Sequence, residues 1–238
     1  MNCKNCNTEI TLKYCPNCGQ SANLKRIDGH YMIHEIEHIF HFERGFLYTV
    51  KEILINPGQT VRNYILENRS RLVKPVIFII LTSLIYTLIN HYFHIEEEYV
   101  KSEGLEKSTV GKILKWIQEN YGYANILIGA FIALWLKVFF KKYGYNFFEL
   151  LIMLCFVTGV AMLLFAFFAF IEGLFHFKLF LLAGIIAVLY SIWAIGNFFE
   201  KRKIGIYVKA LISYFLGTIT FYIIIFAIGL TIDSIIKH

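Results

Sequence analysis

Five long runs of apolar residues constrain this chain more than any other feature of its sequence. Each run is close to the roughly 20 helical residues that are needed to cross the hydrocarbon core of a bilayer. The runs lie near Pro75–Phe93, Ala124–Phe140, Phe147–Ile171, Leu179–Phe198 and Ile206–Ile232. They are continuous rather than alternating, which favours helices over the strands of a membrane barrel. We therefore expect residues 75–238 to form an all-α integral membrane helical bundle of about five transmembrane helices.

The composition agrees with a membrane location. Hydrophobic residues make up 57% of the 238 residues and charged residues only 17%, whereas soluble domains average about 25% charged residues. The chain starts with a polar segment, so we expect no secretory signal peptide. The formal net charge is +6. In a membrane protein, the positions of the basic residues along the chain indicate which side faces the cytoplasm.

The basic residues flank the apolar runs in three groups that alternate along the chain. The groups are Arg62, Arg69, Arg71 and Lys74; Lys137, Lys141 and Lys142; and Lys201, Arg202 and Lys203. In a five-span arrangement all three fall on one side, which the positive-inside rule makes cytoplasmic. The opposite side receives the loop 95–122, where glutamates outnumber lysines. We expect the N-terminus in the cytoplasm and the C-terminus outside.

Residues 1–26 contain four of the five cysteines, arranged as two CxxC pairs: Cys3 and Cys6, then Cys15 and Cys18. Two such pairs supply the four tetrahedral ligands of a structural Zn²⁺ site. Gly19 allows a turn that directs backbone amides at the thiolates. Between the pairs, apolar and polar residues alternate, which predicts a small β-hairpin zinc ribbon. We expect one structural Zn²⁺ per chain, whose binding would supply the folding energy of so short a segment.

The role of this ribbon is less constrained than its metal. A site closed by four thiolates has no open position for catalysis. Basic residues near the ribbon are few: Lys4, Lys13, Lys25 and Arg26. We therefore expect no nucleic-acid binding. The ribbon is better suited to docking a protein partner on the cytoplasmic side.

A histidine stripe marks the juxtamembrane region 27–74, where we expect cytoplasmic amphipathic helices. His30, His34, His38 and His41 fall on one face of a helix. We favour a polar face that bonds to carboxylates, lipid phosphates or water. Two alternatives stay open: a second metal site that draws on these histidines with Glu35 or Glu37, and a peptidase-type site. The second alternative follows from the segment His34–His38, which matches H-E-x-x-H, with Glu35 as the group that would activate water.

The region continues with an apolar stripe that Pro57-Gly58 interrupts. A short basic helix follows, and we expect its cations Arg62, Arg69 and Arg71 to meet anionic headgroups. In the loop 95–122, apolar residues from Val110 to Tyr121 recur at helical spacing, which predicts an amphipathic helix. The centres of the apolar runs carry no ionisable residue, and this argues against an ion-coupled transporter.

Several segments together resemble a known family. They are CPNCG (15–19), HEIEHIFHFERGFLYTVKEILINPGQTVRNYI (34–65) and NRSRLVKPVIF (68–78). The chain resembles, over roughly residues 1–90, an uncharacterised family of bacterial multi-pass membrane proteins with an N-terminal zinc ribbon, of the domain-of-unknown-function 3667 type. The resemblance implies a location in the bacterial inner membrane. It implies no activity, substrate or catalytic residue.

From the sequence we favour a non-enzymatic inner-membrane protein that binds a partner or senses a signal. The lipid bilayer and a cytoplasmic protein are its expected partners, and the oligomeric state stays open. Two alternatives of other classes remain. One is a membrane-associated metalloenzyme that uses the HEIEH segment, and the other is a small-solute or metal-ion permease.

Overall fold

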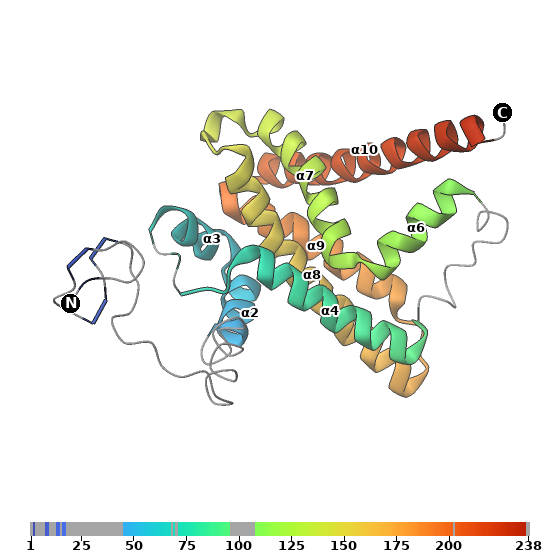
Figure 1. Ribbon diagram of the computed structural model, residues 1–238, viewed down its shortest axis with the longest axis horizontal. Coiled ribbons are helices and arrows are strands. Elements are labelled where there is room, and N and C mark those ends of the chain that lie inside the picture. Colours follow the sequence, from blue (N-terminus) through green and yellow to red (C-terminus); the bar gives the residue numbers. More distant parts are fainter. Residues whose placement is uncertain are drawn as a thin grey trace. The chain divides into compact units, whose positions relative to one another are not determined.

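A computed structural model of the chain describes residues 2, 8, 9, 13, 14, 16, 17, 45–67, 69, 71–95, 108–201 and 203–236. The chain divides into two compact units, Met1–Glu43 and Arg44–His238 (Figure 1). In the first unit, Asn2 and Glu9 form an isolated antiparallel bridge, and Asn17 Nδ2 donates a hydrogen bond to Thr8 Oγ1 at 3.4 Å. The described residues contain no strand, so they do not support the β-hairpin expected for the zinc ribbon.

The second unit is helical. It begins with two short helices, α2 (Phe46–Ile55) and α3 (Pro57–Leu66). Five helices are long and apolar enough to cross a membrane. They are α4 (Pro75–Phe93), α7 (Tyr121–Phe139), α8 (Phe147–Phe175), α9 (Phe180–Phe199) and α10 (Ile204–Ile236). The amphipathic helix α6 (Thr109–Glu119) precedes α7, and a 3-10 turn, η1 (Lys141–Tyr143), precedes α8.

Each apolar run of the sequence forms one of these long helices, so the prediction of five is confirmed. The bounds of α4 are those expected, whereas α8 and α10 are longer than the apolar runs. The extension of α8 ends at His176, whose φ of 57° lies in the left-handed region and stops the helix. Helix α10 continues past the apolar run to Ile236 and so includes Asp233. A polar side chain near a helix end can reach toward water and does not end the helix.

Helix α8 lies at the centre of the unit and α10 at its edge. Helices α4, α7 and α9 all pack on α8, and the apolar segment of α8 is the most buried of the five, while that of α10 is the least. The main core gathers toward one end of the bundle, where α2 and α3 join it. Its largest fully buried side chains include Phe78, Phe156 and Phe198.

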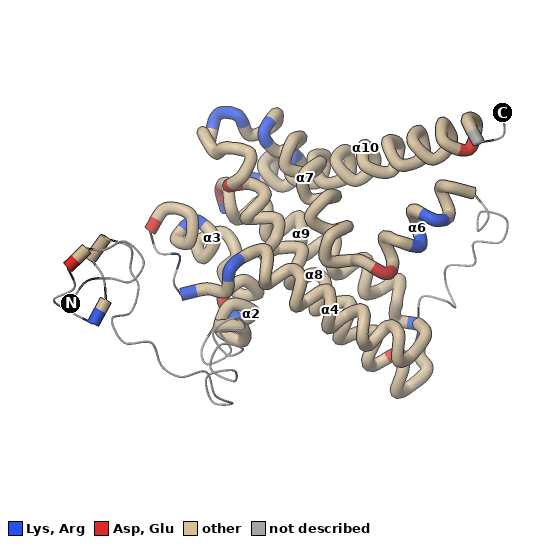
Figure 2. The backbone as a smooth tube through the Cα atoms, in the orientation of Figure 1, with Lys and Arg blue, Asp and Glu red and all other residues tan. Residues whose placement is uncertain are grey.

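The described members of the three groups of basic residues lie at that same end (Figure 2). The chain passes it at the start of α4, between α7 and α8, and between α9 and α10. Ring contacts close the end: Phe140 stacks on Phe199 with centroids 3.8 Å apart, and Tyr145 lies 4.6 Å from Phe198. Figure 2 shows lysines and arginines at α3, at the start of α4 and at the turn after α7. We call this the basic end of the bundle.

Candidate functional site: the helical hairpin at the basic end

The residues that the sequence singled out for metal binding lie outside the described residues. They are Cys3, Cys6, Cys15, Cys18, His30, His34, His38, His41, Glu35 and Glu37. Within the described part of the chain, no group of three or more His, Cys, Asp or Glu side chains could hold a metal ion. The zinc ribbon and the possible second metal site therefore stay predictions.

The best-defined site is the hairpin of α2 and α3, which the single residue Asn56 joins. Proline at the first position of α3 needs no amide hydrogen bond there, so Pro57 can start a helix directly after α2. Each helix buries one face, with Phe46, Thr49 and Ile53 on α2 and Val61, Tyr64 and Ile65 on α3. The spacing of three and four residues is that of an amphipathic helix, so the pattern of the sequence accounts for the docking face.

Gly58 sets how closely the hairpin approaches α9. A Cβ atom at this position would lie 2.1 Å from the backbone oxygen of Asn197 and 2.7 Å from the backbone nitrogen of Phe198. No side chain fits in that space, and the neighbours are backbone atoms with little freedom to move. The start of α3 therefore packs directly on the last turn of α9.

Arg62 fastens the hairpin at the same place. Its Nη1 donates to Asn197 O at 2.9 Å and to Phe198 O at 2.6 Å. These carbonyls belong to the last turn of α9, where helical partners run out and the helix dipole favours a cation. Gln59 Oε1 accepts a hydrogen bond from Arg62 Nη2 at 3.0 Å, which holds the guanidinium in place. The guanidinium thus caps α9 rather than facing headgroups, contrary to the expectation for Arg62.

Two further hydrogen bonds connect α2 to the bundle. The hydroxyl of Tyr190, on α9, donates to Ile53 O at 2.9 Å, near the end of α2. The amide of Val73 donates to Thr49 Oγ1 at 3.1 Å, which joins α2 to the segment leading into α4. Buried backbone groups at element ends need such partners. Hydrogen bonds therefore join both helices of the hairpin to the rest of the bundle.

An aromatic cluster fills the space under the hairpin. Phe46 of α2 lies 5.7 Å from Phe78 of α4 between ring centroids, and Phe78 lies 5.8 Å from Phe156 of α8. Tyr64 of α3 meets Phe156 edge-on at 5.2 Å. Burial raises the pKa of Tyr64, and the charge of Arg69 opposes this rise. Four helices thus share one aromatic core at the basic end.

The rim of the basic end carries an exposed polar network. Lys203 Nζ lies 2.8 Å from Glu200 Oε1, and the Tyr143 hydroxyl donates to Glu200 Oε2 at 3.1 Å. These two contacts, that of Lys203 first, hold the pKa of Glu200 below its ordinary value. The contact with Glu200 also raises the pKa of Lys203. One of the basic residues between α9 and α10 is therefore partly neutralised.

The sequence predicted the break at Pro57-Gly58 and the cationic side chains that follow it. It did not predict that Gly58 and Arg62 both meet the backbone of Asn197. Arg62 and Asn197 are 135 positions apart, and the contact uses backbone oxygens of α9, which any residue carries. The only signal in the sequence was Gly58, because a glycine at a helix start can mark a close approach of backbone. Chemically the site is a closely packed helical hairpin with basic side chains at its rim (Figure 2).

The comparison with known protein families gives a match that includes this hairpin. A family model described as "Protein of unknown function (DUF3667)" matches residues 43–87. The match covers α2, α3 and most of α4, and it supports the predicted likeness to an uncharacterised family. No curated protein and no solved structure matches the chain.

Proposed function

We propose that the chain is a multi-pass protein of the bacterial inner membrane that presents a four-cysteine zinc ribbon to the cytoplasm and acts by binding a partner protein there, without catalysis. The basic end of the bundle is the cytoplasmic end in this proposal, because the positive-inside rule favours cations on that side. The C-terminus then lies on the outer side.

The observation that carries the proposal is the fastening of the hairpin through Gly58 and Arg62. Helices α2 and α3 are held by packing on α9 and by hydrogen bonds from both sides. A hairpin that is held at this many points gives the bundle a fixed surface at its basic end, which is the kind of preorganised surface that a partner protein binds.

The match to the family model also draws attention to the hairpin. It falls on the hairpin and the first apolar helix, so the feature that the chain shares with its family is the junction between its N-terminal segment and the bundle. A shared junction is expected where the family's common task is to attach a cytoplasmic module to a membrane base.

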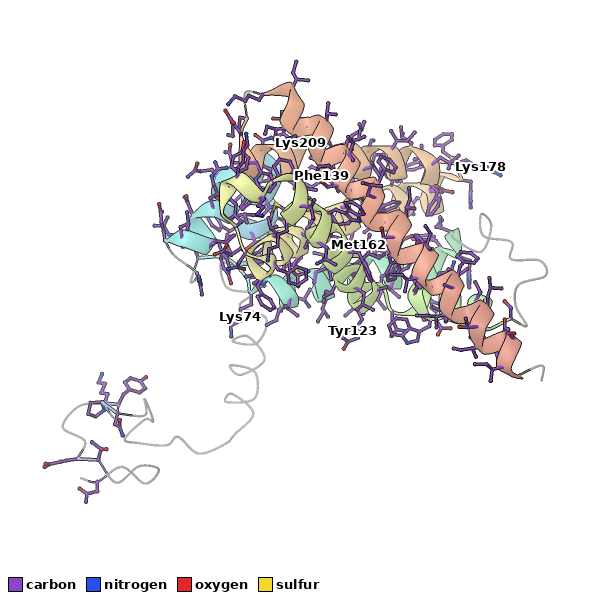
Figure 3. All side chains as sticks on the ribbon, turned by 90° about the horizontal axis from the view of Figure 1, so that it is seen from above. Lys74, Tyr123, Phe139, Met162, Lys178 and Lys209 are labelled. Carbon is purple, nitrogen blue, oxygen red and sulfur yellow. The ribbon has the colours of Figure 1, made fainter. Side chains whose placement is uncertain are left out.

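The test is site-specific photo-crosslinking in cells with the full-length chain. A photoreactive amino acid replaces Tyr14, which is 63% exposed, or as a control Tyr123, which is 60% exposed and lies in the first turn of α7 (Figure 3). We expect a discrete protein adduct from position 14 that Cys15→Ser abolishes, and none from position 123. Adducts that are absent at position 14, or that survive Cys15→Ser, contradict the proposal.

Elemental analysis of the purified chain tests the metal separately. We expect one zinc per chain, lost when Cys15 is replaced by serine, because one missing thiolate opens the tetrahedral site. A second zinc that disappears in the double variant His34→Ala and His38→Ala would instead support a metal site on the histidine stripe. Proteolysis by the purified chain that depends on Glu35 would contradict a non-catalytic role.

A further inference from the structure

Helix α2 carries large apolar side chains on both of its sides. One side is buried in the main core through Phe46 and Ile53. The opposite side is exposed, and its residues recur at helical spacing, which places them on one face. They are Leu47, Tyr48, Lys51, Leu54 and Ile55, and we call them the outer face of α2. A helix that is apolar all round belongs in a protein core or in a membrane.

The outer face lies on the side of the bundle. Helix α2 packs on α8, and at its start the Phe46 ring lies 5.7 Å from the ring of Phe78, one turn inside α4 (Figure 1). At its end, the Tyr190 hydroxyl donates to Ile53 O at 2.9 Å, and Tyr190 belongs to the middle of α9. The 20 residues of α9 make a helix of about 30 Å, which matches the hydrocarbon core. The end of α2 therefore lies alongside α9, at a depth within the membrane, and not beyond the end of the bundle.

The neighbours of the outer face are exposed parts of two long apolar helices. Val76, in the first turn of α4, is 50% exposed. Trp193, on α9, is exposed as well, and its ring lies 5.9 Å from that of Tyr190. Tryptophan is enriched at the boundary between membrane and water. The outer face thus continues the apolar surface of α4 and α9, close to that boundary.

Lys51 distinguishes lipid from protein as the cover of the outer face. It is exposed and lies at the centre of the four apolar side chains. A protein surface on this face would have to desolvate the ammonium group, which costs free energy unless a carboxylate faces it. A phospholipid supplies acyl chains for the apolar side chains and a phosphate that the flexible stem of the lysine can reach. The outer face therefore has the chemistry of a helix that lies in a membrane surface.

The second helix of the hairpin presents a different surface. On α3, Gln59 Nε2 donates to Asn63 Oδ1 at 2.6 Å in an exposed position. Leu66 is the one large apolar side chain that α3 exposes. Exposed amides of this kind suit headgroups and water. The hairpin is thus apolar on the outward side of α2 and polar on that of α3.

We propose that the outer face of α2 lies in the membrane leaflet at the basic end, against the acyl chains of phospholipids, with the ammonium group of Lys51 at their phosphates. The proposal rests on the membrane location proposed above. It makes the hairpin an element embedded in the leaflet. A partner protein then reaches the hairpin from α3 and from the rim of the basic end, and not from α2.

The test is photo-crosslinking of the full-length chain in liposomes of phosphatidylglycerol and phosphatidylcholine in equal amounts, with identical acyl chains. A benzophenone amino acid replaces one residue at a time, and mass spectrometry of the intact chain counts the phospholipid adducts. We expect at least about fivefold more adducts from Leu47 and Ile55 than from Gln59, which is exposed on α3. Val76 is the reference for a position that faces lipid.

The outcomes separate the proposal from the membrane location on which it rests. If Val76 gives lipid adducts but Leu47 and Ile55 give as few as Gln59, the proposal is overturned. Crosslinks from Leu47 or Ile55 within the chain or to a second copy overturn it as well. If Val76 gives no lipid adduct either, the membrane location itself is refuted, and the proposal with it.

The role of Lys51 is tested with charge variants that keep the benzophenone at Ile55. Lys51→Gln should lower the ratio of phosphatidylglycerol to phosphatidylcholine adducts about fivefold, since one lysine near the surface contributes on that order. Lys112→Gln, which removes an exposed lysine from α6, should leave the ratio unchanged. An unchanged ratio in Lys51→Gln overturns the assignment of the phosphate.

A last measurement uses the wild-type chain, so that no replacement can disturb the fold. A phosphatidylglycerol with a diazirine in its acyl chain should label the peptides of Phe46–Ile55 more than those of Pro57–Leu66. Equal labelling of the two helices, or more label on α3, overturns the proposal.

Discussion

Arg62→Met is the sharpest test of the docked hairpin. Methionine keeps the length and the apolar stem of the side chain but removes the donors to Asn197 O and Phe198 O. Hydrogen bonds from a charged group contribute about 1.5–3 kcal/mol each. Arg62 is half-buried, so water can partly replace it, and we expect a total loss of about 2–4 kcal/mol. At roughly 2–4 °C per kcal/mol for a chain of this size, Tm should fall by about 5–15 °C.

The assay is thermal unfolding of the full-length chain in detergent, followed by circular dichroism. Arg71→Met is the matched control because Arg71 is an exposed cation a few residues later in the same segment. Its Tm should stay within about 2 °C of the wild type, as is usual for surface substitutions. Equal Tm values for the two variants would refute the reasoning that Arg62 caps α9.

Three further predictions use the same thermal unfolding assay. Gly58→Ala should lower the free energy of unfolding by about 1–3 kcal/mol or more, because its Cβ would overlap the backbone of Asn197. Gly205→Ala, where a Cβ meets open space, should raise the free energy of unfolding by up to about 1 kcal/mol. Similar effects of the two variants would contradict the close approach of α3 to α9. Ser83→Ala should leave Tm unchanged or raise it, because the buried Ser83 hydroxyl finds no hydrogen-bond partner among the described residues; a drop of several degrees would show a missed partner. Folding lowers the pKa of Glu200, so the stability that Glu200 adds to the fold is present above its unfolded pKa of 4.5 and is lost as the pH falls through the lower folded pKa. Glu200→Gln should therefore reduce the fall of Tm at acidic pH. An unchanged fall would refute the role of the Lys203 and Tyr143 contacts.

The sequence predicted the helices of the bundle well, because a continuous apolar run of about 20 residues has few other solutions. It also predicted the amphipathic helix α6 from the spacing of Val110, Ile113 and Ile117. It did not predict that α6 would be held to α10. That tie runs from Thr109, whose amide donates to the carboxylate of Asp233 at 3.0 and 3.1 Å. A contact over 124 positions leaves no periodic trace in the sequence.

The candidate site was predicted only in its parts. Pro57 and Gly58 were visible as a break and Arg62 as a cation, but a cation beside a membrane has many possible partners. Headgroups, carboxylates and helix ends all attract it. Only the fold shows that the end of α9 comes within reach of Arg62.

The central claim is a five-span bundle whose basic end faces the cytoplasm, and cysteine accessibility in intact cells tests it most directly. Lys142→Cys, between α7 and α8, and Lys178→Cys, between α8 and α9, each serve in a background without other cysteines. A membrane-impermeant maleimide should label Lys178→Cys in intact cells and Lys142→Cys only after lysis. Labelling of Lys142→Cys in intact cells, or of neither position until lysis, would contradict the account.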